Sequence, residues 1–100
     1  MKQFNLKNKK IIFIVNPNSG KLSNKNKLKI ISDCIPNNPD IFFPKNVNET
    51  SKLSAEAFKK DQIVVACGGD GTVNLVANQA IIYDGIMSIL PLGRGNDFAK

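Results

Sequence analysis

Four short runs of apolar residues recur along this chain, and stretches with a different periodicity separate them. The runs are Ile11–Val15, Ile41–Phe43, Ile63–Cys67 and Ile86–Leu90. Nearly continuous apolar runs of this length are typical of strands that are buried on both faces of a parallel sheet. The chain therefore predicts an α/β fold, in which an open parallel sheet carries helices on both faces in the order β-α-β-α-β-α-β.

The intervening stretches have the three-and-four spacing of amphipathic helices. We expect the first helix to begin at a cap on Ser23 or Asn24 and to end before Pro36. The second is expected to open at Asn48 or Thr50 and to continue to Lys60. The third is expected to begin near Val73, capped by Thr72 or Asp70, and to end at Gly85. Because crossovers in such sheets are right-handed, the carboxyl ends of all four strands should meet at one edge, where α/β sheets bind ligands.

Three polar, glycine-containing loops follow strands and should share that edge. They are NPNSGK (16–21), GGDGT (68–72) and LGRGND (92–97). Glycines let main-chain N–H groups point into a concavity, and a helix N-terminus adds a partial positive charge. The three loops together predict a polyphosphate site. Asp70 would repel a bare phosphate, so its expected role is to hold Mg²⁺ beside one.

Two common nucleotide motifs do not fit these loops. No Gly-Lys-Ser/Thr follows Gly71, and Lys21 lacks the upstream glycine of a Walker loop. A dinucleotide fingerprint would need a third glycine where Asn74 stands, and it would follow the first strand rather than the third. The site is therefore expected to bind phosphates in another way.

Composition limits the remaining classes of function. One hundred residues form at most one domain, and no apolar run approaches the length of a membrane helix. The two cysteines have no metal-ligand spacing, which indicates reduced thiols and a cytoplasmic protein. The net charge of +6 favours anionic partners, but the lysines are scattered and no set of stacking aromatic residues accompanies them, so nucleic acid is not expected.

The three motifs resemble the catalytic domain of the diacylglycerol kinase family. That family includes bacterial soluble lipid kinases and sphingosine kinases, and it is related to NAD kinases and 6-phosphofructokinases. The resemblance rests on NPNSG at 16–20, GGDGTVN at 68–74 and LPLGRGNDFA at 90–99, and it spans residues 11 to 100. It implies the N-terminal domain type of NAD kinases and lipid kinases, with ATP-dependent transfer of a γ-phosphoryl group to a lipid hydroxyl and Mg²⁺ as cofactor.

The resemblance also assigns roles to particular positions. Asp70 would lie near the metal and the transferring group, as the catalytic and metal-binding residue. The residues that would bind the nucleotide are Asn16, Pro17, Asn18, Ser19, Gly20, Gly68, Gly69, Asp70, Gly71, Thr72, Val73, Asn74, Gly93, Arg94, Asn96 and Asp97. Two positions depart from the family pattern: Arg94 replaces a small hydroxyl residue, and Phe43 stands near a position where related kinases often have threonine.

We expect these residues to form only the nucleotide-binding N-terminal domain, spanning 1–100, of a longer enzyme. The family's domain continues past Lys100 into a β-rich second domain that carries the carboxylate credited with deprotonating the lipid hydroxyl. By itself the fragment would therefore be inactive. The resemblance further implies a lipid substrate and peripheral association with the inner face of the membrane. An unfinished sheet would expose an apolar edge, which favours a homodimer or aggregation.

Two alternatives remain open from the sequence. In the first, the acceptor is NAD rather than a lipid, because NAD kinases share GGDGT. In the second, the chain is a truncated, non-enzymatic module that binds a nucleotide. Asp97 favours the diacylglycerol kinase-like branch over the sphingosine kinases.

Overall fold

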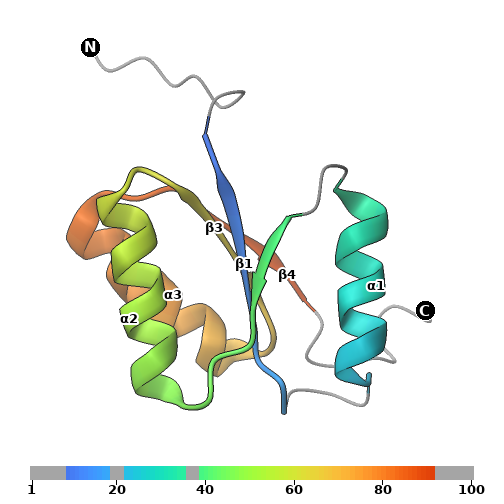
Figure 1. Cartoon of the computed structure of the whole chain (residues 1–100). Coiled ribbons are helices and arrows are strands. Elements are labelled where there is room, and N and C mark those ends of the chain that lie inside the picture. The colour runs from blue at the N-terminus through green and yellow to red at the C-terminus, as the bar shows by residue number, and fades with distance from the viewer. Residues whose placement is uncertain (1–8, 19–21, 36–38, 92–100) are drawn as a thin grey trace.

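The computed structural model describes residues 9–18, 22–35 and 39–91. Its sheet has four strands, β1 (Ile11–Val15), β2 (Asp40–Phe42), β3 (Ile63–Cys67) and β4 (Met87–Leu90). All pairs are parallel and the strand order is β2-β1-β3-β4, so the two most apolar strands, β1 and β3, lie in the centre (Figure 1). The predicted parallel α/β sheet is confirmed.

The helices lie on both faces of this sheet, as predicted. Helix α1 (Asn24–Cys34) lies alone on one face, whereas α2 (Val47–Lys59) and α3 (Asp70–Tyr83) pack against each other on the opposite face (Figure 1). The strand order explains the division: β1 connects to β2 in one direction, and the next two connections run in the other. Right-handed crossovers in opposite directions place their helices on opposite faces.

Alternate residues of the central strands build two hydrophobic cores. The core beneath α2 and α3 contains Ile12, Ile14, Ala57, Phe58, Val64, Ala66 and Val76. The core beneath α1 contains Phe13, Val15, Ile31 and Cys67. Because both faces of β1 and β3 are covered, neither strand needs a polar side, which is why their sequences are unbroken apolar runs.

Helix α1 begins as predicted, whereas the starts of α2 and α3 differ from the expectation. The side chain of Ser23 accepts the N–H of Asn26 at 3.1 Å and caps α1. Helix α2 begins at Val47, and its cap is Asn46 rather than Asn48 or Thr50, with Oδ1 accepting the N–H of Glu49 at 2.8 Å. Asparagine at this position satisfies a donor that the helix itself leaves unpaired.

Helix α3 begins three residues earlier than its apolar periodicity indicates. Its first residue is Asp70 and its N-cap is Gly69, so neither Thr72 nor Asp70 is the cap, and no side chain of the described residues accepts a hydrogen bond there. Thr72 instead lies inside the helix and is buried. An apolar periodicity depends only on the side chains that pack against the core. It therefore could not predict the first turn of α3, which consists of Asp70, Gly71 and Thr72.

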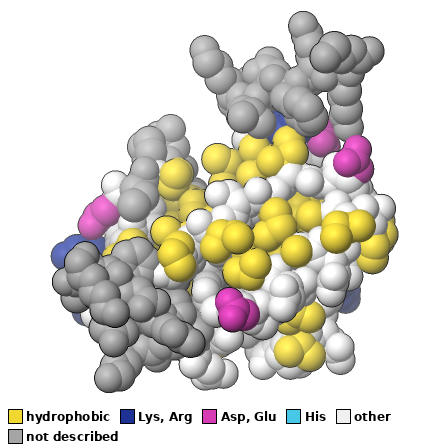
Figure 2. All heavy atoms as spheres, turned by 180° about the vertical axis from the view of Figure 1, so that it is seen from behind, with side chains coloured by type: hydrophobic (Ala, Val, Ile, Leu, Met, Phe, Trp, Pro, Cys, Tyr) yellow, Lys and Arg dark blue, Asp and Glu magenta, His cyan; other side chains and the backbone are white. Residues whose placement is uncertain are grey.

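Three aliphatic side chains near β4 and the end of α3 are exposed. Ile81 is 80% exposed, Ile82 65% and Ile89 52%. Figure 2 shows hydrophobic side chains spread over the face of the molecule behind the view of Figure 1. The expected apolar surface at this side of the sheet is therefore present, and self-association through it stays a prediction. Within the described residues, no helix has both the length and the apolar character that a membrane span requires.

Candidate functional site

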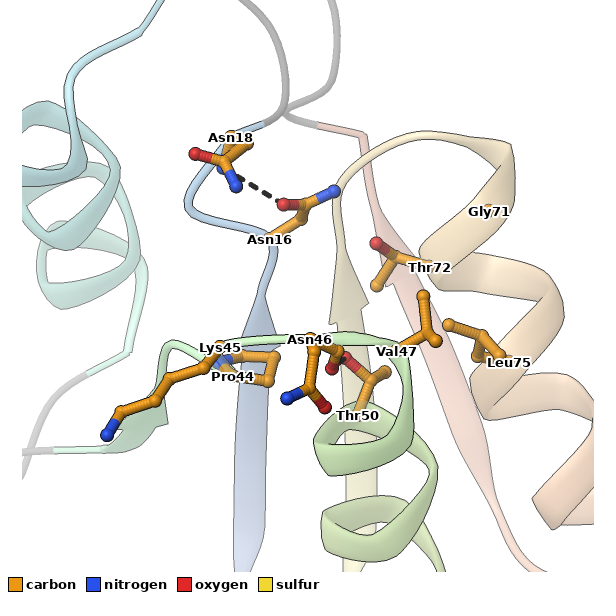
Figure 3. A pocket seen from close by; sticks show the side chains of 10 residues that line it. All are labelled: Asn16, Asn18, Pro44, Lys45, Asn46, Val47, Thr50, Gly71, Thr72 and Leu75. Atoms are coloured by element: carbon orange, nitrogen blue, oxygen red, sulfur yellow. Dashed lines mark hydrogen bonds between the residues drawn. The ribbon is translucent and has the colours of Figure 1, made fainter.

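A pocket of about 270 Å³ lies where the ends of β1 and β2 meet the start of α3 (Figure 3). Three segments line it. Asn16 and Asn18 follow β1, residues 44–47 together with Thr50 form the entry to α2, and Gly71, Thr72 and Leu75 belong to the first turns of α3. The topology thus brings together two of the three glycine-containing loops, which are more than fifty positions apart in the sequence.

Asn16 occupies the centre of this arrangement. Its main-chain N–H donates to the carbonyl of Cys67 at 3.0 Å, which extends the β1–β3 pairing by one residue. Its side-chain Oδ1 accepts the N–H of Asn18 at 2.9 Å, which closes a turn at the pocket wall (Figure 3). Its carbonyl accepts a hydrogen bond from the ammonium of Lys27 at 2.9 Å. The position of Asn16 is therefore set from the sheet, from its own loop and from α1.

The N-terminus of α3 faces the same region with its main-chain donors available. The first N–H groups of any α-helix have no partner within the helix, and here the glycine cap has no side chain to accept them. The N-terminus of α2, by contrast, is closed by Asn46. The aligned peptide dipoles add a partial positive charge at the α3 terminus, which favours an anion there. Of the two helix starts beside the pocket, α3 has the uncapped donors.

The glycines of the GGDG stretch (68–71) differ in whether the fold requires glycine at their positions. Gly68 has φ +157°, and a Cβ added to it would lie 3.0 Å from Thr72 Oγ1 and 3.2 Å from Asn16 Cβ. The turn itself therefore requires glycine at this position. A Cβ on Gly69 or Gly71 would meet no atom of the described residues within 4 Å. These two glycines leave open space above the main chain that the described fold does not use.

The remaining predicted residues either do not line this pocket or lie outside the described residues. Asp70 is exposed as the first residue of α3, and it does not line the pocket. Pro17 is half-buried in the loop, Val73 packs against the core beneath α2 and α3, and Asn74 is exposed. Ser19, Gly20, Gly93, Arg94, Asn96 and Asp97 lie outside the described residues.

Comparison with known proteins agrees with this architecture. The sequence model of the diacylglycerol kinase catalytic domain matches residues 10–100. The chain belongs to this family. A crystal structure of a diacylglycerol kinase from Bacillus anthracis superposes with a TM-score of 0.72 at 27% identity, covering 90% of this chain and 35% of that protein. A second structure from the same organism gives a TM-score of 0.70 at 25% identity, covering 83% of this chain and 32% of that one.

A Caenorhabditis elegans protein that carries the name diacylglycerol kinase is 34% identical, over an alignment that covers 90% of this chain and 10% of the relative. The chain thus spans about a third of the length of the bacterial structures and a tenth of the nematode protein. Both the similarity to the diacylglycerol kinase family and the fold expected from it are confirmed.

The site of this diacylglycerol kinase homologue contains residues that the sequence analysis missed. The β2–α2 loop, from Pro44 to Asn46, forms one wall of the pocket. The topology alone could have predicted this wall. Every strand of a parallel sheet ends at the same edge, so the loop after β2 lies there even though it contains no glycine. Phe43 packs against the core beneath α1.

Mg²⁺ is compatible with this arrangement through Asp70. The described residues contain no group of three or more His, Cys, Asp or Glu side chains that could hold a metal ion by themselves. Magnesium is commonly held by one or two carboxylates together with substrate phosphates, so one exposed carboxylate beside a candidate phosphate site fits it.

The thiol of Cys67, which lies directly before the GGDG turn, should be unreactive in the folded protein. It is fully buried, and burial raises its pKa to about 12. The unfolded thiol ionises near its ordinary pKa of 9.0. The contribution of Cys67 to the free energy of unfolding therefore falls as the pH rises from 9.0 to about 12. Iodoacetamide at about pH 9, where the unfolded thiol is half ionised, should modify Cys67 only after unfolding in urea. Peptide mass spectrometry measures this. Equal labelling of Cys67 in folded and unfolded protein would contradict the prediction.

Proposed function

We propose that this domain is the nucleotide-binding part of a diacylglycerol kinase-type enzyme that transfers the γ-phosphoryl group of ATP to a lipid hydroxyl. The observation that carries the proposal is the open space over Gly69 and Gly71 at the uncapped start of α3. A polyphosphate has the charge and the shape to fill it, since it accepts hydrogen bonds from bare main-chain N–H groups. Family membership supplies the reaction class.

In this proposal the chain acts mainly through positioning and charge. Phosphoryl transfer requires little covalent chemistry of the protein, and most of the catalysis comes from alignment and neutralisation of the phosphates. The turn after β1, from Asn16 to Asn18, and the first turn of α3 orient the nucleotide from two sides of the pocket. Asp70 holds Mg²⁺ at the phosphates. A Mg²⁺ ion held there would supply positive charge that offsets the charge developing on the phosphates.

The location of the proposed enzyme and its contact with the membrane follow from the lipid acceptor. A lipid hydroxyl is presented at a membrane surface, so the full-length protein would work in the cytoplasm, bound peripherally to the inner face of the membrane. The net charge of +6 favours contact with anionic headgroups. Because the chain spans about a third of the length of the bacterial structures that it matches, catalysis is proposed for the full-length protein and not for these residues alone.

Replacing Gly71 with alanine tests where the phosphates bind. The added Cβ would stand in the pocket without touching the described residues, so the fold should be as stable or more stable, because alanine is the better helix former. In the full-length protein we expect the KM for ATP to rise about ten-fold with a smaller change in kcat, as expected when a contact made equally in the ground state and the transition state is lost. Labelled ATP with diacylglycerol or NAD as acceptor measures the activity.

Asn78→Ala is the matched control, because it introduces the same residue at an exposed position of the same helix. It should leave the KM for ATP unchanged. An unchanged KM in Gly71→Ala would remove the GGDG loop from the phosphate site. Transfer to NAD and not to diacylglycerol by the unaltered enzyme would replace the proposed acceptor, and transfer to neither would overturn the proposed function.

A further inference from the structure

Lys27 is the largest side chain that is fully buried among the described residues. It lies near the N-terminus of α1, and its ammonium donates to the carbonyl of Asn16 at 2.9 Å. The described structure gives it no other hydrogen-bond acceptor and no carboxylate partner. Lys9 and Lys10, by comparison, form ion pairs with Asp61 and Asp40. Within the part of the chain that the structure describes, Lys27 is therefore a buried ammonium with one neutral acceptor.

Three effects disfavour the charged form of the Lys27 ammonium. Removing an ammonium from water has a penalty that one hydrogen bond does not offset. Two of its three donors are left without a partner in the described structure. The nearby N-terminus of α1 carries a partial positive charge, and the first turn of that helix contains no acidic residue to neutralise it. Consistent with this, burial lowers the pKa of Lys27 from its ordinary value.

The one hydrogen bond that the Lys27 ammonium makes to the described residues connects it to the pocket. Its acceptor, Asn16, lines the pocket and is also held by Cys67 and by Asn18. A hydrogen bond to one carbonyl does not need a charge, because a neutral donor or a water molecule would satisfy the same oxygen. An anion on the pocket side of Asn16 would make the charge favourable, since two charges separated by protein attract each other much more strongly than in water.

We propose that Lys27 is a positioning residue of the nucleotide site, which holds the main chain at Asn16 and supplies a buried positive charge behind the polyphosphate. This inference rests on the proposed function and deepens it, because it assigns an electrostatic role to a residue of α1 that does not line the pocket. Lys27 acts through Asn16 on the orientation of the loop after β1. Its charge acts on the bound phosphates through the protein, where salt screens it little.

Kinetics of the full-length protein test this role with three variants. Lys27→Met keeps the length and apolar stem but removes the charge, and Lys27→Gln keeps a hydrogen-bond donor without the charge. Lys29→Met removes an exposed charge from the same helix as the control. We expect both Lys27 variants to raise the KM for ATP about ten-fold, while the KM for diacylglycerol and the values of Lys29→Met stay near those of the unaltered enzyme.

Thermal unfolding of the same variants separates this role from a merely structural one. Replacing an unpaired buried charge with an apolar side chain of similar volume should leave Tm unchanged or raise it. A lowered Tm with equal increases in KM for both substrates would make Lys27 a structural residue and overturn the inference. A KM for ATP in Lys27→Met within about two-fold of the unaltered value would do the same.

A measurement on the unaltered protein covers the case in which the variants do not fold. The pKa of Lys27, followed by NMR of its Nζ, should rise when Mg-ADP is added, because a nearby anion favours the charged form. An unchanged pKa with Mg-ADP bound would overturn the inference while leaving the proposed function intact. Failure of the unaltered protein to bind Mg-ADP or Mg-ATP would instead overturn the proposed function.

Discussion

Asp70→Asn in the full-length protein should remove nearly all phosphoryl transfer while the fold stays intact. Asp70 is the exposed first residue of α3, beside the two glycines with open space above them. Asparagine has nearly the same shape but lacks the charge that, in the proposed function, would hold Mg²⁺ at the phosphates. Loss of one preorganised electrostatic contact at a transition state typically lowers kcat by about 10²–10³-fold, and we expect a loss of that order. Lipid phosphorylation from labelled ATP measures it, and circular dichroism checks the fold.

Asp84→Asn provides a control for the loss of a carboxylate from the same helix. Asp84 lies at the opposite end of α3 with a φ of 52°, in the left-handed region that asparagine also adopts readily. This variant should keep full activity. A kcat in Asp70→Asn close to that of Asp84→Asn would exclude Asp70 from the mechanism. A different carboxylate would then have to take the proposed role of Mg²⁺ ligand.

Gly85→Ala should give a large loss of stability at a position far from the pocket. A Cβ added at Gly85 would lie 2.3 Å from Cδ1 and 2.6 Å from Cγ of Phe58. Phe58 is only 5% exposed and belongs to the core beneath α2 and α3, so its ring cannot move without disturbing its neighbours. Overpacking of this kind typically lowers the free energy of unfolding by about 1–3 kcal/mol. Urea denaturation measures the change.

A double-mutant cycle identifies the contact responsible. Phe58→Ala removes Cγ, Cδ1 and Cε1, the ring atoms that the new methyl group would meet, at the cost of a cavity in the core. If the clash is the cause, Gly85→Ala should be much less destabilising in the Phe58→Ala background, because the two changes are coupled. Purely additive effects would assign the loss to the main chain between α3 and β4 and contradict the steric explanation.

The strands could be predicted from the sequence, but the starts of two helices could not. Apolar runs locate β1 and β3 directly, because both faces of each strand are covered. The start of α3 was predicted too late because Asp70 and Gly71 are not apolar and so do not contribute to an apolar periodicity. The start of α2 was misplaced because Asn46 and Asn48 are both plausible caps by residue type. The N–H of Glu49, which the Asn46 side chain reaches, distinguishes them only in three dimensions.

The candidate site was predicted in part. The loops after β1 and β3 were placed at one edge from topology alone, and Asn16, Asn18, Gly71 and Thr72 do line a common pocket. The loop after β2 was missed because it contains no glycine. Lys27 was missed because a lysine among lysines in a helix is expected to face water, and nothing in the local sequence marks it as buried.

The amino-acid sequence by itself determined the class of fold, the order of its elements and the family, because these depend on periodicities and motifs that are local along the chain. Tertiary structure decided which glycines the fold needs and which leave space for a ligand, since that difference depends on atoms from distant segments: Asn16 and Thr72 stand close to Gly68, and Phe58 lies against Gly85. It also decided that Lys27 is buried against Asn16. A side chain's surroundings are set by packing between elements, and no local pattern of residues encodes them.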